Sequence, residues 1–282
     1  MKIVKTISEI REIVKDWRKA GYSIGLVPTM GYLHAGHGSL IEQSVKNNDK
    51  TVVSVFVNPT QFGPNEDLEK YPRDIERDSK LVESLGGDII FNPEASEMYN
   101  TKNYTYITVQ GLSEKLCGIT RPTHFAGVCQ VVSKLFHIVM PDNAYFGLKD
   151  FQQYVIIKTM VEDLNFPVKI NPVNIVREES GIAMSSRNVY LTDDEKKSAL
   201  SLSCTLKKAS QLINNGEKNS KELIKQMQEF ISSHPYTKID YIKIVDINTL
   251  EDIAEIPDNN YAVLLAVYVG KTRLIDNFVQ HS

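Results

Sequence analysis

The chain has 282 residues, of which 42% are hydrophobic and 24% are charged, and its formal net charge is −3. This length allows one large domain or two modest ones with a buried core, and the composition is that of an ordinary globular protein rather than a disordered chain. The slightly negative charge offers no broad basic surface, so the composition does not imply a nucleic-acid partner.

Targeting and redox signals favour a cytoplasmic protein. Residues 1–17 interleave acids and bases with apolar positions, unlike a signal peptide. The longest apolar run, residues 261–269, is too short to cross a membrane and predicts a buried strand. Cys117, Cys129 and Cys204 are widely spaced and form no Cys-x-x-Cys pair, so neither a disulfide framework nor a zinc site is expected.

Strand and helix patterns alternate through the first 176 residues. A capping-box pattern at Thr6 predicts a helix ending near Gly21, ahead of the first strand. The elements expected after it are a strand at 24–27, a helix from Ser39, a strand at 51–57, a helix with Pro72 near its first position and Gly86 as its stop, strands at 89–91 and 104–109, a helix at 126–140, a strand at 144–146, a helix at 151–164 and a strand at 168–176. This alternation predicts an α/β fold with a doubly wound, Rossmann-like parallel sheet and right-handed crossovers.

The pattern changes beyond residue 176. A polar loop with a glycine, residues 177–188, is followed by a helix capped at Thr192 and by a second helix at 223–231. Three strands complete the chain, at 239–245, 261–269 and 272–278. We therefore expect a first domain over residues 1–177 and a smaller C-terminal α+β domain over 178–282, with a hinge between them.

The loop after the first predicted strand carries the strongest chemical signal. Pro28 and Gly31 break the strand, and His34 and His37 follow before the helix resumes. Glycines let the backbone approach a ligand, and the N-terminus of a helix favours an anion, so the two imidazoles beside it suit the phosphates of a nucleotide. An ordinary surface loop with two histidines is the alternative. A zinc pair is a weaker one, because no third ligand lies at metal-site spacing.

Polar clusters follow four of the predicted strands: the histidine loop, residues 58–61, residues 147–153 and residues 177–187. In a doubly wound sheet, ligands bind beyond the carboxyl ends of the strands. Because all four clusters are expected at that edge, they favour a binding site over loops of unrelated composition.

The side chains expected at this edge suit a polyphosphate and a small polar substrate. The cations and hydroxyl donors are His34, His37, Lys149, Arg187, Ser185 and Ser186, and the amides are Asn58, Gln61, Gln152 and Gln153. Positioning and charge neutralisation make up most of the catalysis of attack at a phosphorus atom. Each group also has a plain structural interpretation: an exposed Lys149–Asp150 turn, a solvated helix start, or a flexible linker at 185–187. No Ser-His-Asp or Cys-His grouping suggests covalent catalysis, and no Gly-x-Gly-x-x-Gly follows a strand.

Five segments together resemble the pantoate–β-alanine ligase family. They are LVPTMGYLHAGHGSL, VVSVFVNPTQFGPNEDLEKYPRD, RPTHFAGVCQVV, YFGLKDFQQ and REESGIAMSSRNVYL, and they run in order through almost the first 190 residues. The resemblance weakens in the tail. The family belongs to the larger group of nucleotidyltransferases and class I aminoacyl-tRNA synthetases that share the His-x-Gly-His loop, and residues 184–187 occupy the place of its second, mobile phosphate-binding signature.

The resemblance implies an ATP-dependent condensation of pantoate with β-alanine through pantoyl adenylate, releasing pyrophosphate and AMP. It implies that His37, commonly assigned as the proton donor, His34, Lys149 and Arg187 are catalytic, and that Gln61, Gln153 and Asn58 bind pantoate and β-alanine. The implied ATP-binding residues are Met30, Gly31, Tyr32, Leu33, His34, Ala35, Gly36, His37, Gly147, Leu148, Lys149, Asp150, Val176, Met184, Ser185, Ser186 and Arg187. Mg²⁺ would accompany ATP, with protein ligands that the sequence does not identify, and the protein would be a cytoplasmic homodimer with a mobile C-terminal lid.

Two positions depart from the family pattern. The family usually has a glutamate where this chain has Ala35, and a larger apolar residue where it has Gly38. Loss of that carboxylate leaves open a binding protein with a degenerate nucleotide pocket, while another adenylyl transfer is the alternative among enzymes. Because His34, His37 and Lys149 are present, we expect activity.

Overall fold

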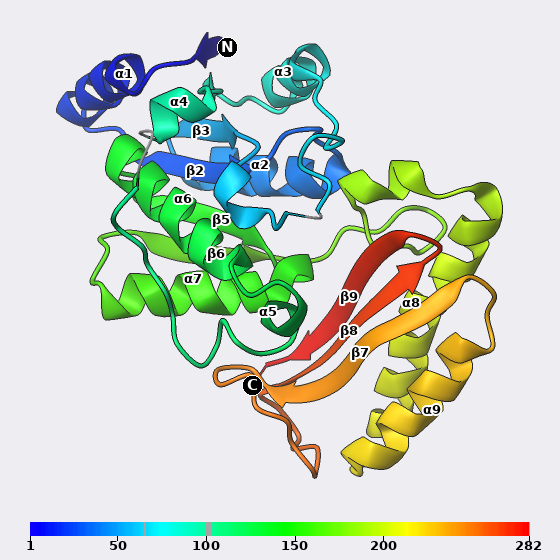
Figure 1. The fold of residues 1–282 in the computed structure, drawn as a ribbon. Helices are drawn as coiled ribbons and strands as arrows, with labels where there is room; N and C mark the ends of the chain where they lie inside the picture. The colour runs from blue at the N-terminus through cyan, green and yellow to red at the C-terminus, as the bar shows by residue number, and fades with distance from the viewer. Residues whose placement is uncertain (65, 100–102, 282) are drawn as a thin grey trace. The chain divides into compact units, whose positions relative to one another are not determined.

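The computed structural model describes residues 1–64, 66–99 and 103–281, and the chain divides into two compact units (Figure 1). The first comprises residues 1–148 and 152–174, and the second comprises residues 149–151 and 175–282. No helix in the described part of the chain is long and apolar enough to cross a membrane.

The first unit is built on a six-stranded sheet in which every strand pair is parallel. Its order is β1-β4-β3-β2-β5-β6. The strands are β1 (Lys2–Val4), β2 (Ile24–Thr29), β3 (Lys50–Val55), β4 (Ile89–Phe91), β5 (Asn143–Gly147) and β6 (Lys169–Val173). The order reverses between β2 and β5, which confirms the doubly wound sheet expected from the sequence.

Helices cover both faces of this sheet. They are α1 (Ile7–Lys19), α2 (Ala35–Asn47), α3 (Ile75–Ser84), α6 (His124–Val139) and α7 (Phe151–Asp163), with short turns of helix at α4 (Ala95–Met98), α5 (Cys117–Thr120), η1 (Pro59–Gln61) and η2 (Leu148–Asp150). Right-handed crossovers put α2 and α3 on one face and α1, α6 and α7 on the other (Figure 1). Leu40 and Ile41 of α2 and Val82 of α3 pack on Val27 and Val53 in one buried cluster.

The second unit is a small antiparallel sheet covered by two helices (Figure 1). Its elements are η3 (Ser186–Tyr190), α8 (Asp193–Asn214), α9 (Ser220–Ser232), β7 (Thr237–Asp246), β8 (Tyr261–Val269) and β9 (Thr272–Gln280). Leu206 of α8 and Met227 of α9 are buried in one cluster with Val263 and Val267 of β8. The predicted α+β composition of the tail is confirmed.

Several predicted boundaries were wrong. The short strand β1 precedes the first helix; only Val4 of its three residues is buried, so it gave no alternating signal. Helix α3 begins after Pro72, because Asp74 caps it by accepting the backbone N–H of Arg77 at 3.0 Å. Strand β6 ends at Val173 rather than at residue 176.

Residues 104–109, all within the described part of the chain, do not form the predicted strand. They belong to no β-ladder, and the side chains of Tyr104 and Tyr106 are 79% and 69% exposed. Aromatic and β-branched residues favour strands because they pack on a pleated surface, and here that packing partner is missing.

Candidate nucleotide and substrate site

Three of the four polar clusters leave the same edge of the first sheet. The histidine loop follows β2, Asn58 and Gln61 follow β3, and Gly147 ends β5. Because β2, β3 and β5 are parallel neighbours, their carboxyl ends meet at one edge. The fourth cluster follows β6 and belongs to the second unit.

The histidine loop makes a tight turn that requires glycine at its bend. Gly31 has φ +84°, and a Cβ there would lie 2.9 Å from Cγ1 of Val55 and 3.1 Å from Oδ2 of Asp78. Tyr32 also has a positive φ, of 51°. Any larger residue at position 31 would collide with side chains of β3 and α3, so the bend requires glycine.

His34 and His37 cap the helix that follows them. Helix α2 begins at Ala35, not at Ser39 as expected, because Nδ1 of His34 accepts the backbone N–H of Gly36 at 3.1 Å and Nδ1 of His37 accepts that of His34 at 3.3 Å. The two ring centroids lie 4.1 Å apart. A ring nitrogen that accepts a hydrogen bond carries no proton, so the neutral rings carry theirs on Nε2. The helix N-terminus therefore presents two imidazole N–H donors beside its partial positive charge.

A buried carboxylate on α3 holds the loop in place. Asp78, 1% exposed, accepts the backbone N–H of Tyr32 at 2.8 Å on Oδ2 and that of Leu33 at 2.7 Å on Oδ1. The guanidinium of Arg77 lies 4.5 Å from the centre of the Tyr32 ring. Burial raises the pKa of Asp78, partly offset by the two backbone donors. Neither Arg77 nor Asp78 was predicted from the sequence, because their positions are typical of charged residues on the exposed face of an amphipathic helix.

Asn58 organises the turn after β3. Its Oδ1 accepts hydrogen bonds from the hydroxyls of Tyr99 at 2.7 Å and Thr60 at 2.9 Å. Its Nδ2 donates to Oε1 of Gln61 at 3.0 Å and to the carbonyl of Gly127 at 3.1 Å. Asn58 is 1% exposed. With its polar atoms occupied by protein groups, Asn58 is placed to orient Gln61 rather than to contact a ligand.

A second group of residues holds the backbone of Gln61. Nδ1 of His124 lies 2.9 Å from the Gln61 carbonyl, and Arg121 lies 3.1 Å from Nε2 of the same histidine. Arg121 also forms a two-pronged ion pair with Glu66. Burial alone would raise the pKa of Glu66, but the hydrogen bonds and charge of Arg121 outweigh it and lower that pKa. The glutamine is therefore fixed from both its side chain and its backbone.

The two glutamines of α7 differ in what surrounds them. Gln152, 5% exposed, accepts the backbone N–H of Cys117 and donates to the carbonyls of Leu112 and Lys115. Gln152 therefore holds the turn formed by residues 112–117. The prediction that its amide faces a substrate was wrong. Gln153 is partly exposed at the start of the helix.

The second unit carries the remaining predicted phosphate-binding residues. Lys149 lies in η2, with Nζ 3.9 Å from Oδ2 of Asp150, and its side chain is 21% exposed. Ser185 caps η3 by accepting the backbone N–H of Arg187 at 3.2 Å. The backbone N–H of Met184 donates to the carbonyl of Val176 at 3.0 Å. Residues 176 and 184–187 are thus held in one folded loop.

A nucleophilic thiol and a cluster of metal ligands are two alternative kinds of site. Burial raises the pKa of the Cys129 thiol to about 12, so its thiolate is not available near neutral pH. Among the described residues, no group of three or more His, Cys, Asp or Glu side chains is arranged to hold a metal ion. The side chains of the two histidines cap the start of α2.

Comparison with known proteins gives one family over nearly the whole chain. A family model described as pantoate-beta-alanine ligase matches residues 2–279, so the resemblance extends through the tail, where the sequence alone suggested that it weakens. Pantothenate synthetases of Clostridium botulinum and Ruminiclostridium cellulolyticum are each 52% identical over 278 residues, which cover 99% of this chain and 99% and 98% of theirs.

Solved structures agree with the sequence comparison. The crystal structure of pantothenate synthetase from Thermus thermophilus is 40% identical, with a TM-score of 0.94 over 100% of both chains. Pantoate-beta-alanine ligase from Francisella tularensis, complexed with beta-gamma ATP and beta-alanine, is 35% identical, with a TM-score of 0.80 over 99% of this chain and 97% of that one. Matched from end to end in sequence and in fold, with both histidines at the carboxyl edge of its sheet, the chain belongs to the pantoate–β-alanine ligase family.

Proposed function

We propose that His34, His37, Lys149 and Arg187 carry the chemistry by which this ligase joins pantoate to β-alanine at the expense of ATP. The family match over residues 2–279 carries the assignment of the reaction. The paired imidazole donors at the N-terminus of α2, fastened by Asp78, support the assignment of the phosphate site.

In the first step, a carboxylate oxygen of pantoate attacks the α-phosphorus of ATP. A bond forms between this oxygen and phosphorus while the bond from phosphorus to the bridging oxygen of the β-phosphate breaks, so pantoyl adenylate forms and pyrophosphate leaves. Negative charge grows on the phosphate oxygens, and Nε2–H groups of His34 and His37 would neutralise part of it. Nε2–H of His37 would also donate a hydrogen bond to the departing pyrophosphate, because Nδ1 accepts a backbone N–H and the neutral ring has no second proton to transfer.

In the second step, the amine of β-alanine attacks the acyl carbon of the adenylate. A C–N bond forms, the C–O bond to AMP breaks, and the nitrogen releases a proton, giving pantothenate and AMP. This step needs an uncharged amine and a well-placed acyl carbon more than a strong acid. Positioning of the adenylate by the protein is therefore its main catalytic requirement.

We assign ATP to the loop of residues 30–37, to residues 147–150, and to Val176 and residues 184–187. Lys149 and Arg187 supply fixed positive charge for the polyphosphate, and the hydroxyls of Ser185 and Ser186 supply neutral donors. The second unit would thereby act as a lid, bringing its cations to ATP only when it closes.

We assign pantoate to Gln61 and Gln153, with β-alanine beside Gln61. The orientation of the Gln61 amide supports this, because Asn58 and His124 fix both its side chain and its backbone. A substrate amide held before binding loses little rotational freedom on binding, which favours affinity. Asn58 would act through Gln61.

Magnesium would reach the site with ATP, on the oxygens of its phosphates. The described residues offer no cluster of carboxylates for an all-protein metal site, which is usual for Mg²⁺ bound with a nucleotide. The ion would neutralise phosphate charge when bound, in concert with Lys149 and Arg187.

We also infer a cytoplasmic homodimer. Cys129 and Cys204 form no disulfide, as in proteins of reducing compartments. The exposed aromatic surface of Tyr104 and Tyr106, in an extended segment of strand-favouring residues, would be covered by the same segment of a second copy. Sedimentation velocity of the wild-type chain and of Tyr106→Asp tests this. A monomeric wild type overturns the homodimer, and a dimer unaffected by the substitution overturns this interface.

The reaction is tested by incubating the protein with Mg-ATP, pantoate and labelled β-alanine. Pantothenate should appear in step with AMP and only when every substrate is present. An adenylylated product without AMP release would indicate another adenylyl transfer. Binding of ATP without turnover would indicate a degenerate pocket, and Ala35→Glu would then be the variant expected to restore activity.

A further inference from the structure

Two adjacent residues of the C-terminal strand contact the two segments of the second unit that carry the proposed phosphate ligands. Nδ2 of Asn277 donates to the backbone carbonyl of Lys149 at 2.9 Å. Asp276 accepts two hydrogen bonds from Arg177, at 2.6 and 3.0 Å. Both β9 residues are buried, at 3% and 4% exposure. These contacts join positions 99 and 128 residues apart in sequence.

The two contacts lie on opposite faces of β9. Successive side chains of a strand alternate between faces, so Asp276 shares its face with Leu274 and Phe278. Leu274 belongs to the buried cluster beneath α8 and α9, and Phe278 packs against it. Asn277 points to the other face. The Lys149 segment and the Arg177 loop are therefore attached to the two sides of a single strand.

The loop anchored by Asp276 is closed at both ends. Arg177 pairs with Ala183 in an isolated bridge, and its guanidinium also donates to the carbonyl of Gly181 at 3.2 Å. At the other end, Nδ2 of Asn188 donates to Glu178 at 2.6 Å and to the carbonyl of Ala183 at 3.1 Å. Between the contacts of Arg177 and those of Asn188 lie Ser185, Ser186 and Arg187. The ion pair between Asp276 and Arg177 therefore holds the start of the loop that carries these three residues.

We propose that Asp276 and Asn277 are positioning residues for catalysis, which set Lys149 and the Ser185–Arg187 loop on one rigid strand so that both reach ATP as a unit. The inference rests on the proposed function for the identity of the phosphate ligands. Neither residue touches substrate; each acts through the segment that it holds. A cation displaced by about 1 Å loses much of its effect on a transition state, so loosening either anchor should slow adenylate formation.

The experiment uses the full-length protein with Asp276→Asn and Asn277→Leu. The first keeps the shape of the side chain and removes the charge that pairs with Arg177, and the second removes the donor to Lys149 at similar size. The matched control is Asp240→Asn. Asp240 of β7 forms a comparable ion pair, at 2.7 and 3.0 Å, with Arg273, which lies in the same strand as Asp276 and Asn277. Pyrophosphate release is measured against ATP and against pantoate, and thermal unfolding is followed for every variant.

We expect kcat/KM for ATP to fall about 10- to 100-fold in both anchor variants while KM for pantoate stays within about twofold of wild type. Asp240→Asn should change neither quantity. Anchor variants with wild-type kcat/KM for ATP overturn the proposal, as does an equal loss in Asp240→Asn, which would point to general destabilisation. Should Asp276→Asn fail to fold, Asn277→Leu decides alone.

Titration of each protein with Mg-ATP separates this proposal from the proposed function. If the wild type binds ATP but forms no pantothenate, the proposed function fails. In that case, ATP binding by the anchor variants that is at least tenfold weaker than that of the wild type still supports the positioning role. If the wild type forms pantothenate and the variants bind and turn over ATP as well as it does, the function stands and the positioning role fails.

Discussion

The carboxylate of Asp78 accepts the backbone N–H of Leu33 at 2.7 Å, joining α3 to the histidine loop across 45 residues of sequence. Its other oxygen accepts the N–H of Tyr32. Both donors lie directly before His34, so this one side chain sets the direction in which the loop enters α2. The geometry of the two imidazoles thus depends on a residue of another helix.

We expect Asp78→Asn to lower the rate of adenylate formation by about 10- to 100-fold. The amide offers one acceptor oxygen, so one of the two backbone N–H groups would face an NH₂ group, at a cost of about 1–3 kcal/mol. Pyrophosphate release and chemical unfolding measure the two effects. The exposed Asp16→Asn serves as the control, and unchanged activity in Asp78→Asn would remove the carboxylate from this role.

The same carboxylate should shape the pH dependence of stability. Burial raises the pKa of Asp78 in the folded protein, so the folded state holds its proton at pH values where the unfolded chain, with a pKa of about 3.9, has lost it. The contribution of Asp78 to the free energy of unfolding is therefore greatest at pH values below the pKa of Asp78 in the unfolded chain. This contribution falls as the pH rises through the pKa of Asp78 in the folded protein. The unfolding free energy of wild type minus that of Asp78→Asn should decrease from pH 4 upward in urea titrations; an increase would contradict the assignment.

His37 serves both as cap and as donor, and two substitutions separate these roles. Glutamine at the third helical position can accept the backbone N–H of His34 in a capping box, whereas alanine cannot. We expect His37→Gln to unfold close to the wild-type temperature and His37→Ala to lose about 1 kcal/mol more. Both should slow adenylate formation by about 100-fold or more, because both lose the imidazole donor.

Exposed His281→Gln is the control for this pair. A wild-type rate in His37→Gln would mean that the ring acts only as a cap. A wild-type rate in His37→Ala would remove His37 from the reaction altogether.

The sheet could be predicted from sequence because its signals are local. Strands such as β3 are buried on both faces and read as continuous β-branched runs, and right-handed crossovers leave few ways to arrange them. Once the strands are parallel, the loops after β2, β3 and β5 must share an edge. The placement of the histidines, Asn58 and Gln61 at that edge was therefore predicted from pattern alone.

The residues that hold the site could not be predicted in the same way. Asp78 has the sequence context of a solvated helix face and is nevertheless 1% exposed. Asp276 and Asn277 act through partners about a hundred residues away, and no local periodicity encodes such contacts. The contacts of Asn58 with Tyr99 and Gln61 could not be predicted either, because the sequence context of a loop amide is the same whether it faces a ligand or holds another side chain.

Gly38 illustrates a departure from the family pattern that the packing explains. A Cβ at Gly38 would lie 3.3 Å from Cδ1 of Leu85, so the end of α3 fills the space that a larger residue would take. We expect Gly38→Ala to stabilise the protein by up to about 1 kcal/mol, because Leu85 is only partly buried and its methyl group can turn aside. Gly38→Leu should cost about 1–3 kcal/mol, and Leu85→Ala should relieve it. Urea unfolding of the single and double variants tests this; additive effects would show that the two positions do not compete for space.

The hydroxyl of Tyr99 should matter to pantoate although it lies two contacts away from the expected ligand. It donates to Oδ1 of Asn58, whose Nδ2 in turn donates to Oε1 of Gln61. In Tyr99→Phe, Oδ1 of Asn58 still accepts the hydroxyl of Thr60 but loses the hydroxyl of Tyr99. The side chain of Asn58 is then held less firmly, and so is the side chain of Gln61 that it contacts. We expect KM for pantoate to rise by about three- to tenfold, a cost near 1 kcal/mol, with KM for ATP unchanged.

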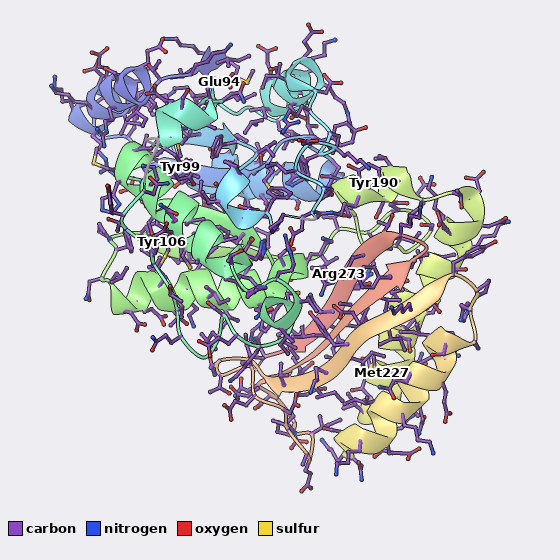
Figure 2. All side chains as sticks on the ribbon, in the orientation of Figure 1. Glu94, Tyr99, Tyr106, Tyr190, Met227 and Arg273 are labelled. Carbon is purple, nitrogen blue, oxygen red and sulfur yellow. The ribbon has the colours of Figure 1, made fainter. Side chains whose placement is uncertain are left out.

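The matched control is Tyr106→Phe, since the hydroxyl of Tyr106 donates only a long bond, of 3.4 Å, to the carbonyl of Asn103 on an exposed segment (Figure 2). That variant should match wild type in both constants. If Tyr99→Phe raises both KM values alike, the tyrosine supports the fold rather than the pantoate site. Wild-type constants in Tyr99→Phe would instead mean that Thr60 and Gly127 hold Asn58 sufficiently on their own.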